Sequence, residues 1–300
     1  MPGEPTPTAA EALSYLRERR NWGRWGADDQ RGAINLITPE KRIRAASLVR
    51  SGRSVSLSRD IPTVPGRNNP APATHWLRVF DVGVVDHIGI AYHGYVTTHV
   101  DALCHVWDEA GMWNGRDPKI EVTSEGARFG SIDHWRDGIT TRGVLLDVPK
   151  FRGEPSVTIE KPVHGDELAA IAKAQGVTLE PGDALVVYSG REAWQSANPD
   201  WSGYRPPSPG LHASCLPFVR DNDVAVLAWD LMDAAPNEYG MTWTMHGAIF
   251  AYGVALLDNA LLQPLAEACA EENRYEFMLT FAPLPVVGGT GSPVNPIALF

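Results

Sequence analysis

The order of apolar and polar positions predicts strands and helices that alternate along most of the chain. Short apolar runs bounded by turn residues are typical of buried strands. Helical periodicity is found in residues 166–176, between an aspartate and a glycine, whereas residues 283–300 have the composition of a loop. This alternation predicts an α/β fold, a single domain with mixed sheets. The expected strands are residues 142–148, 183–190, 224–230, 253–258 and 275–281.

The N-terminal part lacks this alternation. Residues 9–20 predict a short helix after a polar start, and residues 21–32 are rich in Gly, Trp and Asp without periodicity, which is typical of an ordered loop. A further helix is expected after Thr38, because threonine caps helix N-termini and the proline that follows suits the first helical position. We therefore expect an N-terminal arm and Trp-rich loop over residues 1–37 and the main domain over residues 38–300.

Composition and charge exclude several classes of function. The chain is 44% hydrophobic and 21% charged, as expected for a globular protein with a buried core. It has no apolar run of about 18 residues and no signal-peptide pattern at its start, which argues against a membrane protein and against secretion. A net charge of −10 argues against nucleic-acid binding. Three widely spaced cysteines do not suit a disulfide framework, so a cytoplasmic location is expected.

The densest candidate chemistry lies in residues 91–111. Ionisable side chains there occupy odd positions, and on a strand such positions share one face. The Cα atoms of His99 and Asp101 would lie about 6.6 Å apart, close enough for both side chains to bind one ion. His105 lies on the same face or just after the strand ends, where its imidazole would carry protons, since its ordinary pKa is near neutrality. A purely structural network is the alternative, but a half-buried strand gains little from burying three ionisable groups. The odd-numbered residues are His93, Tyr95, His99, Asp101 and His105.

The segment THVDALCH, residues 98–105, resembles the T-H-x-D-A-x-x-H core motif of the kynurenine formamidase/cyclase family. Further blocks resemble the family in the same order along the chain. His246 is followed twelve residues later by Asp258, the spacing of a His and an acid in the family. The remaining blocks are residues 142–148, 180–190, 209–212 and 289–294.

The resemblance implies a swivelling β/β/α domain, commonly a homo-oligomer, with a divalent zinc or manganese ion. It implies that His99 and Asp101 are metal ligands and that His105 is the catalytic histidine. His246 and Asp258 would face this group or bind a second ion. Members of the family hydrolyse aryl formamides or strained cyclic amides such as isatin, using metal-activated water.

Several positions depart from the family pattern, and the most important is the first ligand. The first ligand histidine of the family corresponds to Tyr95 in this chain, and the nearest histidine is His93. Six residues of straight strand would place His93 about 20 Å from His99, so it can reach the same ion only if the chain bulges or folds back near Gly94. Tyr95 could ligate the ion, donate a hydrogen bond to an oxyanion, or act as an acid.

Aromatic residues near the motif suggest where a substrate binds. Four tryptophans in loop-like segments are candidates for lining a pocket for an aromatic substrate. Packing in the core or at a subunit interface is the equal alternative. His212 follows a Pro-Gly pair, so it either contacts substrate or caps a helix. The four tryptophans are Trp25, Trp76, Trp107 and Trp113.

These patterns leave three hypotheses for function. The first is a divalent-metal hydrolase that cleaves the C–N bond of an aryl formamide, lactam or similar cyclic amide, with His105 as general acid and base. The second is a natural-product cyclase or dehydratase on the same scaffold, metal-free, with Tyr95 and His105 as acid and base. The third is a binding protein without catalysis. Each expects a small, aromatic or cyclic molecule as the bound partner.

Overall fold

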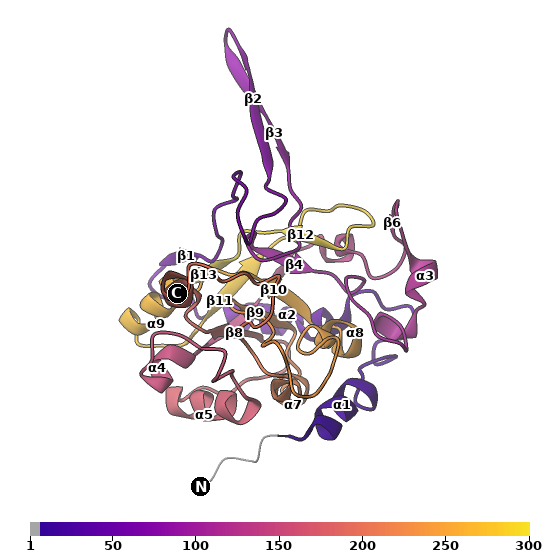
Figure 1. Ribbon diagram of the computed structural model, residues 1–300, viewed down its shortest axis with the longest axis vertical. Helices are drawn as coiled ribbons and strands as arrows, with labels where there is room; N and C mark the ends of the chain where they lie inside the picture. Colours follow the sequence, from indigo (N-terminus) through magenta and orange to yellow (C-terminus); the bar gives the residue numbers. More distant parts are fainter. Residues whose placement is uncertain (1–6) are drawn as a thin grey trace.

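A nine-stranded mixed sheet organises the molecule, as seen in a computed structural model that describes residues 7–300 (Figure 1). Four neighbouring strands, β7 to β10, are parallel, and the strands on both sides of them are antiparallel. The α/β prediction with mixed sheets is confirmed. In sheet order the strands are β1 (Ser54–Ser56), β13 (Ile297–Leu299), β11 (Glu276–Phe281), β7 (Ile139–Asp147), β8 (Ala184–Tyr188), β9 (Val226–Trp229), β10 (Ala255–Asp258), β4 (His99–Asp101) and β12 (Gly291–Pro293).

Short helices pack around this sheet (Figure 1). Thr8 and Thr38 cap the first two through their side-chain oxygens, as their sequence suggests. Single 3-10 turns occupy residues 32–36, 113–115, 132–135 and 213–215. The helices are α1 (Ala9–Arg17), α2 (Pro39–Ala46), α3 (Pro118–Glu121), α4 (Val148–Arg152), α5 (Gly165–Gln175), α6 (Arg191–Ala197), α7 (Leu216–Asp221), α8 (Gly247–Tyr252) and α9 (Gln263–Glu271).

The parallel strands form the centre of the core. Every residue of β9 and β10 is buried, which explains why these strands appear in the sequence as continuous apolar runs. Helix α1 joins the same core through Leu16 and packs on α7 and α8. Part of the expected N-terminal arm falls on residues 1–6, outside the described residues. No helix within residues 7–300 is both long and apolar enough to span a bilayer.

Three local predictions differ from the structure. Residues 283–300, expected as loop, contain β12 and β13, whose pairing partners β4 and β11 are distant in sequence. The chain from 91 to 105, treated as one strand, keeps strand geometry only in β4. Helix α5 has His164 rather than an aspartate at its N-cap.

A β-hairpin protrudes from the otherwise globular outline (Figure 1). It consists of β2 (Thr74–Phe80) and β3 (Gly83–Gly89), which pair only with each other. We call this hairpin the arm. All seven residues of β2 and six of the seven of β3 are exposed. Two further short strands, β5 (Val122–Thr123) and β6 (Gly126–Ala127), form a second small hairpin.

Candidate metal centre and active site

Strand β4 places His99 and Asp101 on one face, as the period of two predicts. It lies between β10 and β12 in the sheet. In the antiparallel pairing with β10, His99 is directly opposite Asp258. Directly opposed residues project to the same face, so the register brings the Asp258 carboxylate beside the two side chains of β4. His99 Nε2 lies 3.3 Å from Asp101 Oδ1 and 3.9 Å from Asp258 Oδ2.

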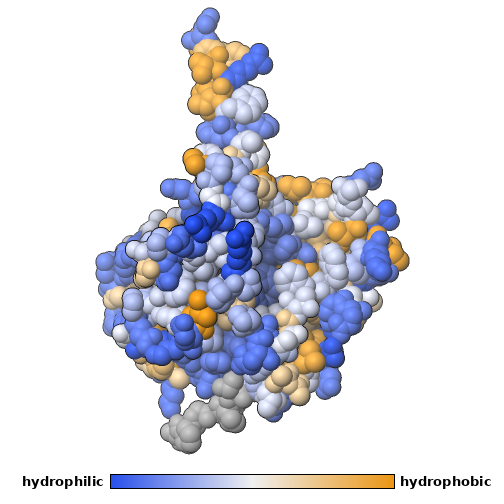
Figure 2. Space-filling model, viewed as in Figure 1, coloured by the Kyte–Doolittle hydropathy of each residue, from blue (hydrophilic) through white to orange (hydrophobic). Residues whose placement is uncertain are grey.

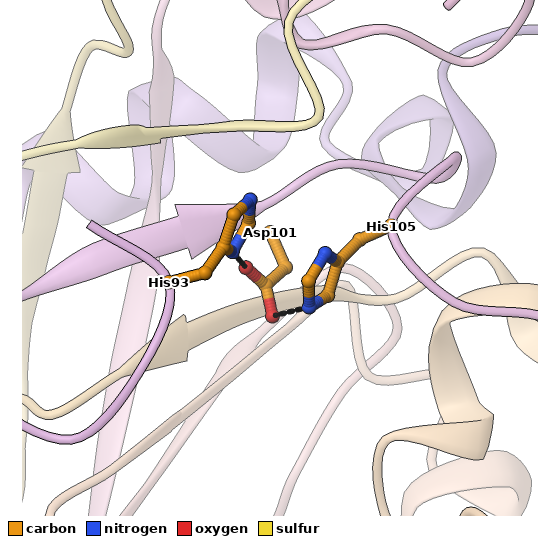
Figure 3. Close-up of side chains that lie close together, drawn as sticks. All are labelled: His93, Asp101 and His105. Carbon is orange, nitrogen blue, oxygen red and sulfur yellow. Dashed lines mark ion pairs between the residues drawn. The ribbon is translucent and has the colours of Figure 1, made fainter. Parts of the chain in front are cut away.

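His93 reaches the same group because the chain bends after it. Gly94 has a φ of 140°, in the region that favours glycine, and the following residues form a bend. His93 Nδ1 then lies 2.9 Å from Asp101 Oδ1 (Figure 3), and its Nε2 contacts the Thr290 hydroxyl at 2.9 Å. Gly291 makes room for this ring, since a Cβ there would lie 2.9 Å from His93 Cε1. The fold-back that the sequence required of His93 is therefore present.

His105 joins the cluster through a turn just after the strand ends, which is one of the two positions that the sequence left open for it. Strand β4 ends at Asp101, and the backbone N–H of His105 donates to the Ala102 carbonyl at 3.0 Å. The turn stacks the His105 ring on that of His93, with centroids 3.9 Å apart. His105 Nε2 faces Asp101 Oδ2 at 3.6 Å, on the other side of the carboxylate from His93 (Figure 3).

His246 completes the cluster from the start of α8. Its Nε2 lies 3.2 Å from Asp258 Oδ2 and 4.0 Å from Asp101 Oδ2. Its Nδ1 donates to the carboxylate of Asp233, which fixes the ring. Asp258 in turn accepts a hydrogen bond from the Trp229 indole at 2.5 Å. The predicted pair of His246 and Asp258 thus lies with the β4 residues.

Asp233 is a site residue that the sequence analysis missed. It follows β9 within the segment WDLMD, close to the carboxyl end of a central parallel strand. Functional residues gather at such ends in α/β sheets. The acidic residues after this strand were therefore the available signal, although no spacing in the sequence linked Asp233 to His246.

The donor set fits a divalent cation. Asp101 is fully buried, yet neither of its oxygens accepts a hydrogen bond from the described residues. His99 Nδ1 donates to the Thr97 carbonyl at 2.8 Å, so Nε2 is the nitrogen that faces the carboxylate oxygens. Positive charge, from a proton or from an ion, must lie between Nε2 and these oxygens, and a ring nitrogen held from behind is typical of metal-ligating histidines. Two groups have ligand atoms within 4.8 Å of one another: His93, Asp101 and His105, and His99, Asp101 and Asp258.

The electrostatics of the imidazoles support this interpretation. Burial opposes the charged form of His99, but Asp101, Asp258 and the Thr97 carbonyl together outweigh it and raise the pKa to about 8. The pKa of His246 also lies well above its ordinary value despite burial, because Asp233 and Asp258 face its two nitrogens. Burial lowers the pKa of His105 to about 4, against the effect of Asp101, so His105 is neutral at pH 7. Positive charge is therefore stabilised at His99 and His246 but not at His105.

A cavity of about 400 Å³ opens over this cluster. His99, His105, His246 and Asp258 are at its floor, and Tyr95 lies on its wall. Burial raises the pKa of Tyr95, so its phenol keeps its proton. The Tyr95 ring packs edge-on against Tyr204 at 4.8 Å. The other apolar or aromatic lining residues are Tyr204, Pro206, Met232, Ala234, Ala235 and Trp243.

The predicted substrate-binding residues lie elsewhere. Trp113 is buried in the core with Trp25 packed against it, Trp76 is on the arm, and Trp107 is at the surface. His212 caps a 3-10 turn by accepting from the Ser214 N–H, and its other nitrogen pairs with Glu238. None of these five lines the cavity in the described structure. Core packing of Trp113 and capping by His212 are the alternatives that the sequence left open for these residues, because the composition of a loop does not tell which way a side chain points.

Comparisons with known proteins give a family match and several similar solved structures. A family model described as "Putative cyclase" matches residues 54–236. No curated protein sequence matches the chain. A crystal structure of a novel cyclase superposes with a TM-score of 0.81 at 29% identity, covering 94% of this chain and 99% of that one.

Two more distant structures share the fold. One is an isatin hydrolase bound to the product analogue thioisatinate, with a TM-score of 0.59 at 17% identity over 85% of this chain and 94% of that one. The other is described as a predicted metal-dependent hydrolase from Bacillus stearothermophilus, with a TM-score of 0.53 at 14% identity over 82% of this chain and 97% of that one.

Proposed function

The chain belongs to the cyclase family, and on this basis we propose that it is a divalent-metal-dependent hydrolase of the C–N bond in an aryl formamide, lactam or similar cyclic amide. The resemblance that the sequence motif predicted is thereby confirmed. The observation that carries the proposal is the buried Asp101 carboxylate, which accepts no hydrogen bond from the described residues and faces imidazole nitrogens. The isatin hydrolase among the structural relatives supports an amide substrate.

In this proposal His99, Asp101 and Asp258 hold the ion, with His93 and His246 beside them. We expect zinc or manganese, since imidazole and carboxylate together suit both. A divalent ion supplies Lewis-acid activation of water and of an acyl oxygen. A cavity with aromatic and aliphatic walls suits a small aromatic or cyclic substrate. The three free, buried cysteines agree with the expected cytoplasmic location.

His105 would move the protons, and Tyr95 would stabilise the oxyanion. The neutral His105 imidazole accepts a proton from the attacking water at Nε2, and Asp101 Oδ2 at 3.6 Å stabilises the imidazolium that results. His105 then returns the proton to the leaving nitrogen. Tyr95, which stays protonated, donates a hydrogen bond to the developing oxyanion from the cavity wall.

One observation favours the alternative of a metal-free cyclase or dehydratase. Tyr95 and His105 line the same cavity, so an acid and a base are available without an ion. The two proposals differ in whether activity survives removal of metal.

The test is elemental analysis of protein purified without chelators or metal-affinity tags, followed by hydrolysis assays on isatin and on an N-formylated aniline. We expect about one or two zinc or manganese ions per chain, and His99→Ala to lose both the ion and turnover. His134→Ala, a change at an exposed histidine away from the cavity, is the control and should retain both. Full activity of metal-free protein would reject the metal-dependent mechanism and favour acid–base catalysis by Tyr95 and His105.

A further inference from the structure

Part of the cavity wall belongs to the segment that joins β9 to α8 (Figure 1). Asn237, Thr242 and Trp243 line the cavity from this segment. The Trp243 ring lies 5.8 Å from the ring of His246, so this side of the wall is close to the cluster. We call residues 236–243 the flap. Among the hydrogen bonds of the described residues, two join the flap to the rest of the molecule.

The chain on both sides of the flap is fixed. Before it, Ala235 and Ser208 exchange two backbone hydrogen bonds of 2.7 and 3.0 Å. After it, the Thr244 hydroxyl donates to the Asp233 carboxylate. Within it, the Asn237 side chain closes a turn by bonding to the backbone N–H and carbonyl four residues later. The flap is therefore a closed turn between two fixed points, and its position depends on what holds its tip.

A small number of contacts hold the tip. Glu238 Oε2 lies 3.0 Å from His212 Nε2, and we call this contact the latch. The Tyr239 ring packs edge-on against the His212 ring with centroids 4.6 Å apart, and its hydroxyl donates to the Pro7 carbonyl. Tyr239 and Met241 also pack partly against the core. Figure 2 shows a body surface that is mostly hydrophilic, and the Glu238 side chain is 68% exposed. Segments held by few contacts next to water are those that open locally.

The buried His212 ring is fixed in one tautomer. Its Nδ1 accepts from the Ser214 N–H at 3.1 Å. Burial lowers the pKa of His212, so the ring is neutral at pH 7 and its single proton is on Nε2. Nε2 therefore donates to the Glu238 carboxylate, and hydrogen bonds to an ionised acceptor are stronger than neutral ones. The body of the protein thus presents a fixed donor to the tip of the flap.

We propose that His212 is a positioning residue for the reaction, which through Glu238 holds the flap closed so that Asn237 and Trp243 keep the substrate against the cluster. This inference rests on the proposed function, because it assigns the cavity to substrate binding. His212 is outside the cavity lining in the described structure, so its effect passes through the flap. An open flap loses contacts with the substrate but not with the reacting atoms, and such a loss raises KM while kcat is unchanged.

Two substitutions separate the latch from the cap at His212. Asparagine has its side-chain oxygen where Nδ1 lies, so His212→Asn keeps the acceptor for the Ser214 N–H and loses the donor to Glu238. Glutamine has its amide nitrogen close to the place of Nε2, so His212→Gln keeps the donor and loses the cap. We expect His212→Asn to raise KM for isatin or for the N-formylated aniline by about fivefold. His212→Gln should keep the KM of the wild type but melt at a lower temperature.

Hydrogen exchange gives a second measurement that needs no turnover. Amide exchange of a peptide that covers the flap, followed by mass spectrometry, should be about fivefold faster in His212→Asn and in Glu238→Ala than in the wild type. In His212→Gln it should match the wild type. Glu271→Ala is the control, because it removes a side chain of similar exposure, 67%, from a surface ion pair with Arg53. The control should change neither flap exchange nor KM.

The outcomes distinguish this inference from the proposed function. Unchanged flap exchange in His212→Asn would overturn the latch. Faster exchange with an unchanged KM would show that the flap does not position the substrate, and a KM that rises equally in His212→Asn and His212→Gln would assign the effect to the cap. If the wild type hydrolyses neither substrate, the proposed hydrolase fails, while flap exchange still supports or overturns the latch.

Discussion

A carboxylate as completely buried as that of Asp101 costs several kcal/mol unless surrounding charge compensates it. The imidazoles of His93, His99, His105 and His246 approach its two oxygens from 2.9 to 4.0 Å. Each of these rings arrives from a different backbone setting: a bend, a strand, a turn and a helix start. The position of each ring therefore depends on the residues that contact it from outside the cluster.

Asp233 is such a group for His246, and Asp233→Asn tests it. The Asp233 carboxylate accepts from the backbone N–H of Met245 through one oxygen and from His246 Nδ1 through the other. An asparagine that keeps the first contact turns its amide N–H₂ toward Nδ1, which moves the ring proton to Nε2 and blocks that lone pair. We expect zinc affinity to fall by about 10- to 100-fold in competition with a chromogenic chelator.

Asp221→Asn, a change at a half-exposed acid paired with Arg19 at the surface, serves as the control and should leave zinc affinity unchanged. Equal affinity in Asp233→Asn and wild type would show that His246 does not depend on this contact.

At the scale of elements, the bend over residues 93–97 is held by a buried clamp. The Asn259 amide donates to the carbonyls of Gly94 at 2.5 Å and Thr97 at 3.2 Å. The buried Arg191 donates to Asn259 Oδ1 at 2.6 Å and also to the Tyr95 carbonyl. This clamp fixes both His93 and the carbonyl of Thr97 that orients His99.

Asn259→Gly removes the clamp without straining the backbone, because Asn259 has a φ of 55° that glycine adopts freely. We expect the free energy of unfolding to fall by about 2 kcal/mol or more, since buried donors and acceptors lose their partners. Denaturant unfolding measures this. Asn273→Gly changes an exposed asparagine with a φ of 50° and should be nearly neutral; a similar loss in both variants would contradict a specific clamp.

How far the sequence predicted these elements depends on the range of the interactions. The shared face of His99 and Asp101 was predictable, because the period of a strand is a local property. The position of His93 depends on Gly291 and Thr290, almost 200 residues away. The sequence therefore indicated only that the chain must bulge or fold back near Gly94 for His93 to reach the cluster. The arm was missed, since its strands are apolar on both faces and lack the alternation by which strands are recognised.

At the scale of the whole molecule, buried acids gather where the parallel strands end. Asp147 ends β7, Asp230 follows β9, and Asp258 ends β10. Burial raises the pKa of Asp147, and it raises that of Asp230 to about 6 although the backbone N–H of Arg191 works against it. The folded protein therefore binds a proton at Asp230 between about pH 4 and 6 that the unfolded chain has released.

The consequence for stability has a definite sign. Because the native state holds more protons in this window, the contribution of Asp230 to stability falls as the pH rises from about 4 to 6. Relative to that of Asp230→Asn, the free energy of unfolding of the wild type should fall by about 3 kcal/mol across this range. Melting temperatures of the two proteins measured over the range show this difference. Asp200→Asn, a change at an exposed acid, is the control, and its stability should change with pH as that of the wild type does. If the stability of the wild type relative to Asp230→Asn rises with pH over this range, the assignment is wrong.

The walls and the floor of the cavity come from different parts of the chain. Three of the candidate ligands lie on paired strands whose register cannot slip by one residue without turning the ligands away. Most of the wall, by contrast, belongs to two loops, residues 203–208 and 232–244. Substitutions in these loops, other than at Asp233, which contacts His246, do not alter the strands that carry the ligands. Selectivity can therefore diverge among descendants of this protein while the reaction stays the same, and directed evolution of new substrates should begin by randomising these two loops.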